Sequence, residues 1–223
     1  MPPPYSVVQH EVTDSTQDDA RAAFDGTPVL VVAAGQRRGR GRSANEWQNA
    51  PRAMAASLAV RPDWDSSRLP LVPLLAGVAA ARVIDCRLKW PNDVFMGEVK
   101  VGGILVEGGD GPVVVGFGVN LWWPDAPDGY GAVYPDDPGS GRDIEIAESW
   151  AGELLDLLAS GPTAWPRDEY RQRCITLGRD ITWSPDGAGR AIDIAPDGAL
   201  IVVTPQGRTT LHAGEVRHVR GEP

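Results

Sequence analysis

The stretch CRLKWPNDVFMGEVKVGGILVEGGDGPVVVGFGVNL, residues 86–121, carries the clearest fold signal in the chain. Its apolar, β-branched runs are short, and turn residues separate them at 91–93, at Gly97 and at 108–109. Runs of this kind predict strands that are joined by tight turns. We therefore expect a strand, a turn, a hairpin and a further strand in this order.

Toward the N-terminus, strand and helix patterns alternate. A strand is indicated where apolar and polar side chains alternate, and a helix where Ser15 or Thr16 can serve as an N-cap ahead of acidic residues. A near-continuous apolar run indicates a buried strand. The expected elements are a strand at 5–12, a helix at 14–24, a buried strand at 27–34, a strand at 53–60 and a helix within 66–84 whose regular part follows Pro73.

Toward the C-terminus, proline, glycine and aspartate dominate residues 122–142, which predicts a mobile loop. Helical spacing follows at 143–160 and, with more polar residues, at 164–175. After Gly178 short strands alternate with turn signals, which predicts a separate β-barrel of about forty-five residues. We expect an α+β fold in which helices flank a mixed sheet, with domains at 1–176 and 177–223.

Composition limits the possible functions. With 223 residues, 42% of them hydrophobic, the chain can form one sizeable core and a small appended domain. A net charge of −9 argues against a general nucleic-acid binder, which needs broad basic faces. The longest apolar runs are too short, or too interrupted by proline, to span a bilayer. We expect a cytoplasmic protein with no nucleic-acid or membrane partner; Cys86 and Cys174 predict neither a zinc site nor a disulfide framework.

Positive charge is concentrated in the segment GQRRGRGRSANEW, residues 35–47, which has four arginines between Arg37 and Arg42. Its glycines let the backbone approach a ligand, and Arg40 and Arg42 can each bind a carboxylate or phosphate in bidentate fashion. Of 21 basic residues only Lys89 and Lys100 are lysines. Two explanations of this count are equally good. One is codon bias toward arginine, and the other is that both positions need a compact ammonium group in a tight site.

Two glycine-rich segments accompany these cations. KVGGIL places Lys100 beside the open backbone of Gly102 and Gly103, and GFGVN ends a strand at Asn120. Taken singly, such motifs are more often a bulge, a turn or a solvated tract. Together they predict a site for one carboxylate-bearing and one phosphate-bearing ligand, with almost no candidate nucleophile or general base. Catalysis there would rest on positioning and charge stabilisation.

The motifs in their order resemble the biotin protein ligase family, also called biotin-(acetyl-CoA-carboxylase) ligase. The resemblance implies the biotin/lipoate ligase catalytic fold, which is class II synthetase-like, and it extends into a C-terminal SH3-like β-barrel. The chain resembles the short form of the family, which does not have the N-terminal DNA-binding domain. The motifs that carry it are STQ at 15–17, Gln36, GRGR at 39–42, Trp47, KWPND at 89–93, KVGGIL at 100–105 and GFGVN at 116–120.

The activity that the resemblance implies has two steps. The carboxylate of biotin attacks the α-phosphate of Mg-ATP, which gives biotinyl-5′-AMP and pyrophosphate. A lysine of a biotin carboxyl carrier domain then attacks the mixed anhydride. Biotin, ATP and Mg²⁺ are thus the implied ligands, and the carrier domain of a biotin-dependent carboxylase is the implied partner. Family members are monomers or homodimers.

Site residues follow from the same resemblance, position by position. Lys100 corresponds to a lysine that contacts carboxylate and phosphate oxygens, where a cation offsets developing charge. Together with Arg42 and Asp93 it is a candidate catalytic residue. The resemblance implies that Ser15, Thr16 and Gln36 hold the fused ring, that Arg40 and Arg42 lie near its carboxylate and the adenylate phosphate, that Asn92 and Asp93 lie on the ATP side, and that Gly39, Trp47, Lys89, Gly103, Ile104, Gly118 and Asn120 complete the binding pocket.

Purely structural explanations also exist for several of these residues. Trp90 and Pro91 are equally explained by packing, Asn92 and Asp93 by an Asx-type turn, and Thr16 by a helix cap. One of Trp122 and Trp123 could stack on adenine, or both could simply anchor the loop that they open.

The chain departs from the family after GRGR. Where a further basic residue and a glycine-arginine pair are usual, it has Ser43 to Glu46. The loss of one buried charge-assisted hydrogen bond would cost roughly 1.5 to 3 kcal/mol of adenylate binding, which predicts that the intermediate leaks. Three alternatives stay open: a lipoate or octanoate ligase, which shares the core fold and carboxylate activation; a non-catalytic biotin-binding or carrier-binding homologue that has lost turnover with its loop; and a nucleic-acid module built on RRGRGR.

Overall fold

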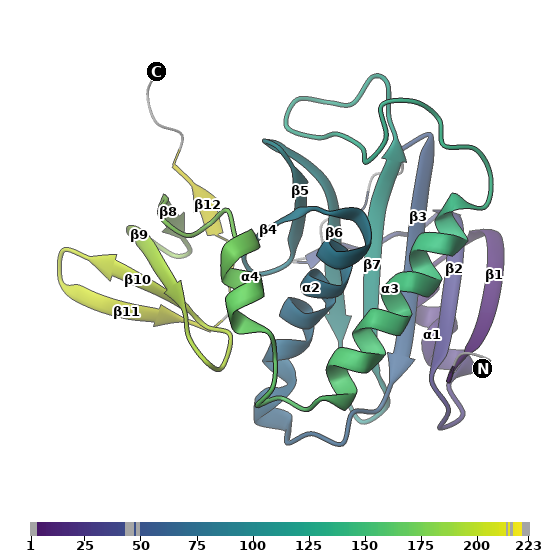
Figure 1. The fold of residues 1–223 in the computed structure, drawn as a ribbon, viewed down its shortest axis with the longest axis horizontal. Coiled ribbons are helices and arrows are strands. Elements are labelled where there is room, and N and C mark those ends of the chain that lie inside the picture. The colour runs from purple at the N-terminus through teal and green to yellow at the C-terminus, as the bar shows by residue number, and fades with distance from the viewer. Residues whose placement is uncertain (1–3, 43–46, 48–49, 213, 215, 220–223) are drawn as a thin grey trace.

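A seven-stranded mixed sheet forms the centre of the molecule (Figure 1). The computed structural model describes residues 4–42, 47, 50–212, 214 and 216–219. The strand order is β1-β2-β3-β7-β6-β5-β4; β1 runs parallel to β2, and every other pair is antiparallel. The strands are β1 (Ser6–Thr13), β2 (Val29–Gln36), β3 (Arg52–Val60), β4 (Arg87–Lys89), β5 (Asp93–Met96), β6 (Val99–Glu107) and β7 (Val113–Trp122).

Helices cover both faces of this sheet. On one face α2 (Val72–Ile84) and α3 (Arg142–Ala159) cover the sheet, and the even-numbered residues of β3, such as Met54 and Leu58, belong to the core between them. On the other face Ala20 of α1 (Thr16–Ala23) packs on the alternate residues, such as Ala59. The period of two in a strand separates these sets, so the predicted mixed sheet flanked by helices is confirmed.

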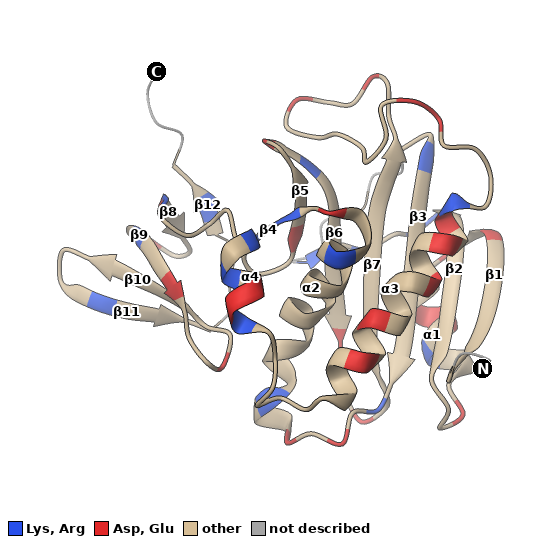
Figure 2. Ribbon diagram, viewed as in Figure 1, with Lys and Arg blue, Asp and Glu red and all other residues tan. Residues whose placement is uncertain are grey.

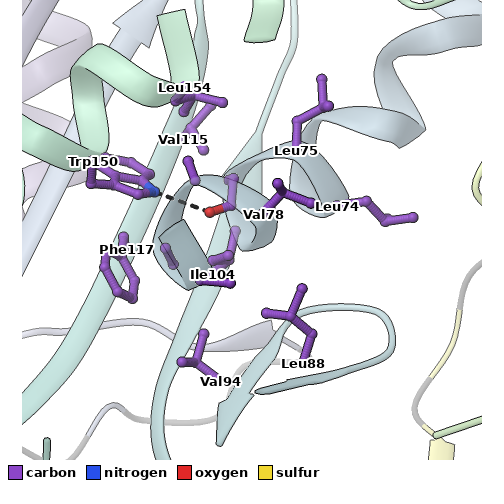
Figure 3. Close-up of a cluster of buried hydrophobic side chains, with 14 of the residues drawn as sticks. Leu74, Leu75, Val78, Leu88, Val94, Ile104, Val115, Phe117, Trp150 and Leu154 are labelled. Carbon is purple, nitrogen blue, oxygen red and sulfur yellow. Dashed lines mark hydrogen bonds between the residues drawn. The ribbon is translucent and has the colours of Figure 1, made fainter. Parts of the chain in front are cut away.

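The core between the sheet and the two helices α2 and α3 is close-packed (Figure 3). The indole of Trp150 lies 5.4 Å from the ring of Phe117, and its Nε1–H donates to the carbonyl oxygen of Ala76 at 3.1 Å. One helical segment, Ser66–Ile84, is long and apolar enough to cross a membrane. Its first part is a 3-10 helix, η2 (Ser66–Leu71), and ten of the 13 residues of α2 are buried in this core.

A second, antiparallel sheet follows the short helix α4 (Arg167–Arg173). Its strand order is β11-β10-β9-β8-β12, which agrees with the predicted small SH3-like domain. Buried residues of this sheet join the main core, so the two sheets are packed together. The boundary between residues 176 and 177 stays a prediction. The strands are β8 (Asp180–Trp183), β9 (Gly187–Ile194), β10 (Leu200–Thr204), β11 (Gly207–Leu211) and β12 (Val216–His218).

The loop predicted to be mobile between β7 and α3 is partly anchored. Gly129 accepts a hydrogen bond from the backbone N–H of Lys100, and the N–H of Gly131 donates to the Lys100 carbonyl, both at 2.9 Å. The N–H of Val133 donates to the carbonyl of Asn120, also at 2.9 Å. The middle of the loop is therefore attached to β6 and β7 beside Lys100.

Candidate active site

A cavity of about 500 Å³ lies on the α1 face of the main sheet. Its floor is a row of residues in register across four strands: Ala55 pairs with Gly118, Gly118 with Gly103, and Gly103 with Asp93. Three of these four residues have at most a methyl side chain, so the sheet surface is low here and leaves room for a ligand. The glycines of KVGGIL and GFGVN thus meet as direct cross-strand neighbours.

Trp47 forms a wall of the cavity over this floor. A Cβ atom on Gly118 would lie 3.0 Å from the Trp47 ring, and one on Gly39 would lie 3.0 Å from the Cβ of Trp47. The backbone N–H of Trp47 donates to the Gly39 carbonyl at 3.0 Å. Both glycines therefore let the indole approach closely, although Gly39 itself is not among the described cavity-lining residues.

One end of the cavity is polar and uncharged. The backbone N–H and the hydroxyl of Thr16 donate to Oε1 of Gln36 at 2.8 and 3.1 Å, so the Gln36 side chain caps α1. The Thr16 hydroxyl also lies 2.8 Å from the hydroxyl of Ser57, and both side chains are buried. Ser15 is the N-cap residue of α1 and lines the same end. These groups suit a polar, uncharged ligand head.

The other end is cationic. Nζ of Lys100 lies 2.5 Å from Oδ1 of Asp93, and Nζ of Lys89 lies 3.8 Å from Oδ2 of the same carboxylate. Nη1 of Arg42 donates to Oδ1 of Asn92 at 3.1 Å, while the Asn92 amide donates to the Ile104 carbonyl at 2.8 Å. Among the lining residues that the structure describes, Asp93 is the only carboxylate, so an excess of cations faces this end.

The arginine segment divides into two parts. Arg40 and Arg42 line the cavity, whereas Arg37 and Arg38 pair with Asp14 outside it, at 3.4 and 2.5 Å. The guanidinium of Arg40 binds Asp18 at 2.8 and 2.9 Å. It also reaches the carboxylate of Glu107 at 3.2 Å.

These ion pairs change the titration of the carboxylates. Hydrogen bonding to Arg40 lowers the pKa of Asp18, and Arg38 lowers the pKa of Asp14. Arg40 was expected to face an anion of the ligand. In this structure the anions that it contacts are the carboxylates of Asp18 and Glu107. Residues 43–46, on which the expectation of a weakened loop rests, lie outside the described residues.

A buried hydrogen-bond chain supports the cationic end from behind. The hydroxyl of Thr176 accepts the backbone N–H of Trp90 at 3.0 Å and lies 3.2 Å from Nε2 of His218. The indole N–H of Trp90, only 2% exposed, donates to the Gly198 carbonyl at 3.0 Å. Burial, with help from Lys89 and Arg179, lowers the pKa of His218 to about 4. The packing interpretation of Trp90 is thus confirmed, and the second sheet touches the KWPND turn.

Most residues proposed from the sequence meet in this one cavity. All the predicted site residues line it except Gly39, while Trp122, a candidate for adenine stacking, is not among the described lining residues. Trp123 contacts the lining residue Tyr130, with ring centroids 6.3 Å apart.

Within the described residues no group of three His, Cys, Asp or Glu side chains could hold a metal ion. The lining residues that lie outside the motifs found in the sequence are Ala55, Ala56, Ser57, Tyr130 and Val216.

Comparison with known proteins gives one family. A sequence profile of the biotin/lipoate A/B protein ligase family matches residues 9–120. A biotin-(acetyl-CoA-carboxylase) ligase of Paracoccus denitrificans is 34% identical, over 92% of this chain and 97% of the relative. A protein of the same name from Mycobacterium tuberculosis is 31% identical, over 93% and 87%.

A solved structure has the same fold. It is a biotin protein ligase from Aquifex aeolicus in complex with biotin and ATP, with a TM-score of 0.84. At 21% identity the alignment covers 97% of this chain and 99% of that one. At this identity the likeness concerns the fold, including the second sheet.

Proposed function

Because the chain belongs to the biotin/lipoate A/B protein ligase family, we propose that it is a biotin protein ligase. It would join biotin to ATP as biotinyl-5′-AMP and then pass the biotinyl group to a lysine of a biotin carboxyl carrier domain. One observation carries the proposal: a single cavity joins an uncharged polar end to a cationic end across a glycine floor. Biotin has a polar ureido ring at one end and a carboxylate at the other, in the same order.

In the first step the residues of the cavity bind and orient. Thr16, Gln36 and Ser57 offer hydrogen bonds to the ureido ring, and the low floor accepts the flat bicyclic part. A biotin carboxylate oxygen attacks the α-phosphorus; the bond to the β-phosphate breaks, and pyrophosphate leaves with the electron pair. Lys100 and Arg42, which both line the cavity, would offset the charge that grows on the phosphoryl oxygens.

In the second step the amine of the carrier lysine attacks the carbonyl carbon of the mixed anhydride. A carbon–nitrogen bond forms, AMP leaves with the electron pair of the broken carbon–oxygen bond, and the amine loses a proton. Asp93, at the cationic end, is the carboxylate that would orient the incoming amine by accepting one of its N–H groups, so that the nitrogen lone pair stays free for the attack. Lys100 would again offset the charge, now on the departing phosphate.

Magnesium would enter with ATP as its phosphate complex, since Mg²⁺ usually keeps several waters and takes few protein ligands beside substrate phosphates. Asp93 is the lining carboxylate available to such a complex. Because ATP is consumed, we expect the reaction to take place in the cytoplasm.

The test of this proposal is Lys100→Ala. We expect loss of pyrophosphate release with biotin and ATP, because a cation that would offset the charge on the phosphoryl oxygens is removed, while the fold measured by circular dichroism is kept. Arg38→Ala is the matched control, since Arg38 lies outside the cavity, and it should retain activity. Unchanged pyrophosphate release from Lys100→Ala would sink the assigned role, and competition by lipoate rather than biotin would favour the lipoate alternative.

A further inference from the structure

The lysine side chains of this chain are confined to one place. Lys89 and Lys100 are the only lysines among 21 basic residues, and both line the cavity. The other basic residues in this count are arginines. Figure 2, which colours lysine and arginine alike, shows basic residues on both sheets and on several helices. The proposed intermediate would therefore meet amine side chains only inside the site.

The chemistry of the intermediate makes this distribution matter. A mixed acyl-phosphate anhydride acylates any free amine: the nitrogen lone pair attacks the carbonyl, AMP leaves, and a proton is released. A guanidinium is always charged and is a poor nucleophile, so arginine does not react in this way. An arginine-covered surface is thus inert toward intermediate that escapes from the site.

Inside the site a single carboxylate holds both amines. Nζ of Lys100 lies 2.5 Å from Oδ1 of Asp93, and Nζ of Lys89 lies 3.8 Å from Oδ2. The Lys100 and Lys89 side chains are 30% and 19% exposed. An ammonium in such a pair has no lone pair, and it must lose a proton and leave Asp93 before it can attack. The Lys100 contact is a charge-assisted hydrogen bond, which is among the strong ones, whereas the Lys89 contact is an ion pair without a hydrogen bond.

We propose that Asp93 protects Lys89 and Lys100 from acylation by the biotinyl-adenylate, so that this ligase is inert to its own intermediate. The inference rests on the proposed function and adds a selectivity role: Asp93 disfavours the two resident amines, and only an incoming carrier lysine is presented as a free nucleophile. Arginine on the surface completes the protection. The ligase then transfers biotin without labelling itself.

Purified protein is incubated with synthetic biotinyl-5′-AMP, without ATP, and each adduct is located by peptide mapping; the N-terminal amine is counted separately. Wild type should carry no adduct on Lys89 or Lys100, and an adduct on either overturns the proposal. Asp93→Asn should acquire an adduct on Lys100, and a folded, unlabelled Asp93→Asn protein also overturns it. Arg208→Lys, an exposed position on β11, supplies a reference amine that should be labelled.

A second measurement avoids any change at Asp93. The Arg208→Lys protein is treated with a small amine-acylating ester, and labelling rates are compared within one molecule. Lys100 should react on the order of tenfold more slowly than the lysine at 208 in the native protein, because its ion pair must break and its side chain is only 30% exposed. The two should react equally in urea; equal native rates contradict the protection.

A separate reaction tests the proposed function, so that its failure can be distinguished from a failure of the protection by Asp93. In a parallel tube wild type receives biotin, Mg-ATP and a biotin carboxyl carrier domain. An unlabelled carrier counts against ligase activity, whereas the lysine map of the ligase itself decides on the protection.

Discussion

Gly103 is the position where protein stability and ligand binding should separate most clearly. A Cβ atom built there lies 3.8 Å from the Asn92 carbonyl oxygen and from the Trp47 ring, and 3.9 Å from Cε of Lys100. These are ordinary van der Waals distances, so alanine fits the protein without strain. The added methyl group, however, occupies the floor on which the proposed ligand lies.

Gly103→Ala should have opposite effects on stability and on biotin binding. Gly103→Ala should leave the free energy of unfolding unchanged or raise it by about 0.4 to 1 kcal/mol, because the unfolded chain loses freedom. An extra methyl in a filled site typically costs about 1 to 3 kcal/mol. Biotin binding should therefore weaken by about 5- to 150-fold.

Gly118→Ala is the matched variant on the neighbouring strand. Its Cβ would lie 3.0 Å from the Trp47 ring, so the methyl must displace the indole. We expect a loss of about 1 to 3 kcal/mol of unfolding free energy through overpacking. Gly103→Ala should thus damage binding alone, whereas Gly118→Ala, on the same floor and against the Trp47 wall, should also damage stability, although the glycines are direct cross-strand partners.

Isothermal titration calorimetry with biotin and urea denaturation measure the two properties. If Gly103→Ala binds biotin as tightly as wild type, the ligand does not lie on the glycine floor and the reasoning is refuted. If Gly118→Ala keeps full stability, Trp47 does not pack where the structure places it.

Two further predictions concern the buried chain behind the KWPND turn. Thr176→Val should lower the unfolding free energy by about 1 to 3 kcal/mol, because the Trp90 N–H is left buried without a partner; a loss below about 0.5 kcal/mol in urea denaturation argues against that bond. The pKa of His218 is lowered from 6.5 to about 4, so between these values the unfolded chain binds a proton that the folded chain does not, and stability should fall as the pH drops through this window. After allowance for solvent screening of a half-buried ring, we expect a loss of about 1 to 2 kcal/mol by pH 4. His218→Gln should flatten this part of the pH profile of thermal unfolding, and an equally steep profile would assign the effect to other groups.

The fold was predictable where its signals are local. The turns at 91–93 and 108–109 and the apolar runs between them predict β4 to β7, and each is present. The helix expected within 66–84 begins as the 3-10 helix η2, a form that was not predicted, since Pro70 interrupts the pattern of a regular helix. The strand order was not predicted, because pairing depends on contacts between distant parts of the chain.

The site was predictable as a set of motifs but not as a geometry. Gly103 and Gly118 stand out in sequence, whereas their pairing depends on the register of β6 and β7. Ser57 offered a weak signal as the one hydroxyl in an apolar strand. Tyr130 and Val216 offered none, because a loop and the second sheet bring them to the cavity.

The arginine segment illustrates the same limit. Four arginines predict an anion site, yet Arg37 and Arg38 pair with Asp14 outside the cavity. Only the folded chain distinguishes them from Arg40 and Arg42, because the direction of each side chain depends on which carboxylates the tertiary structure brings near.

The most direct test of the proposed function is intact-mass spectrometry of a purified biotin carboxyl carrier domain after incubation with this protein, biotin and Mg-ATP, with lipoate in place of biotin in a second tube. The ligase account predicts one biotin adduct per carrier domain in the first tube and none in the second. An unmodified carrier in the first tube, with biotin still bound by the protein, would contradict it.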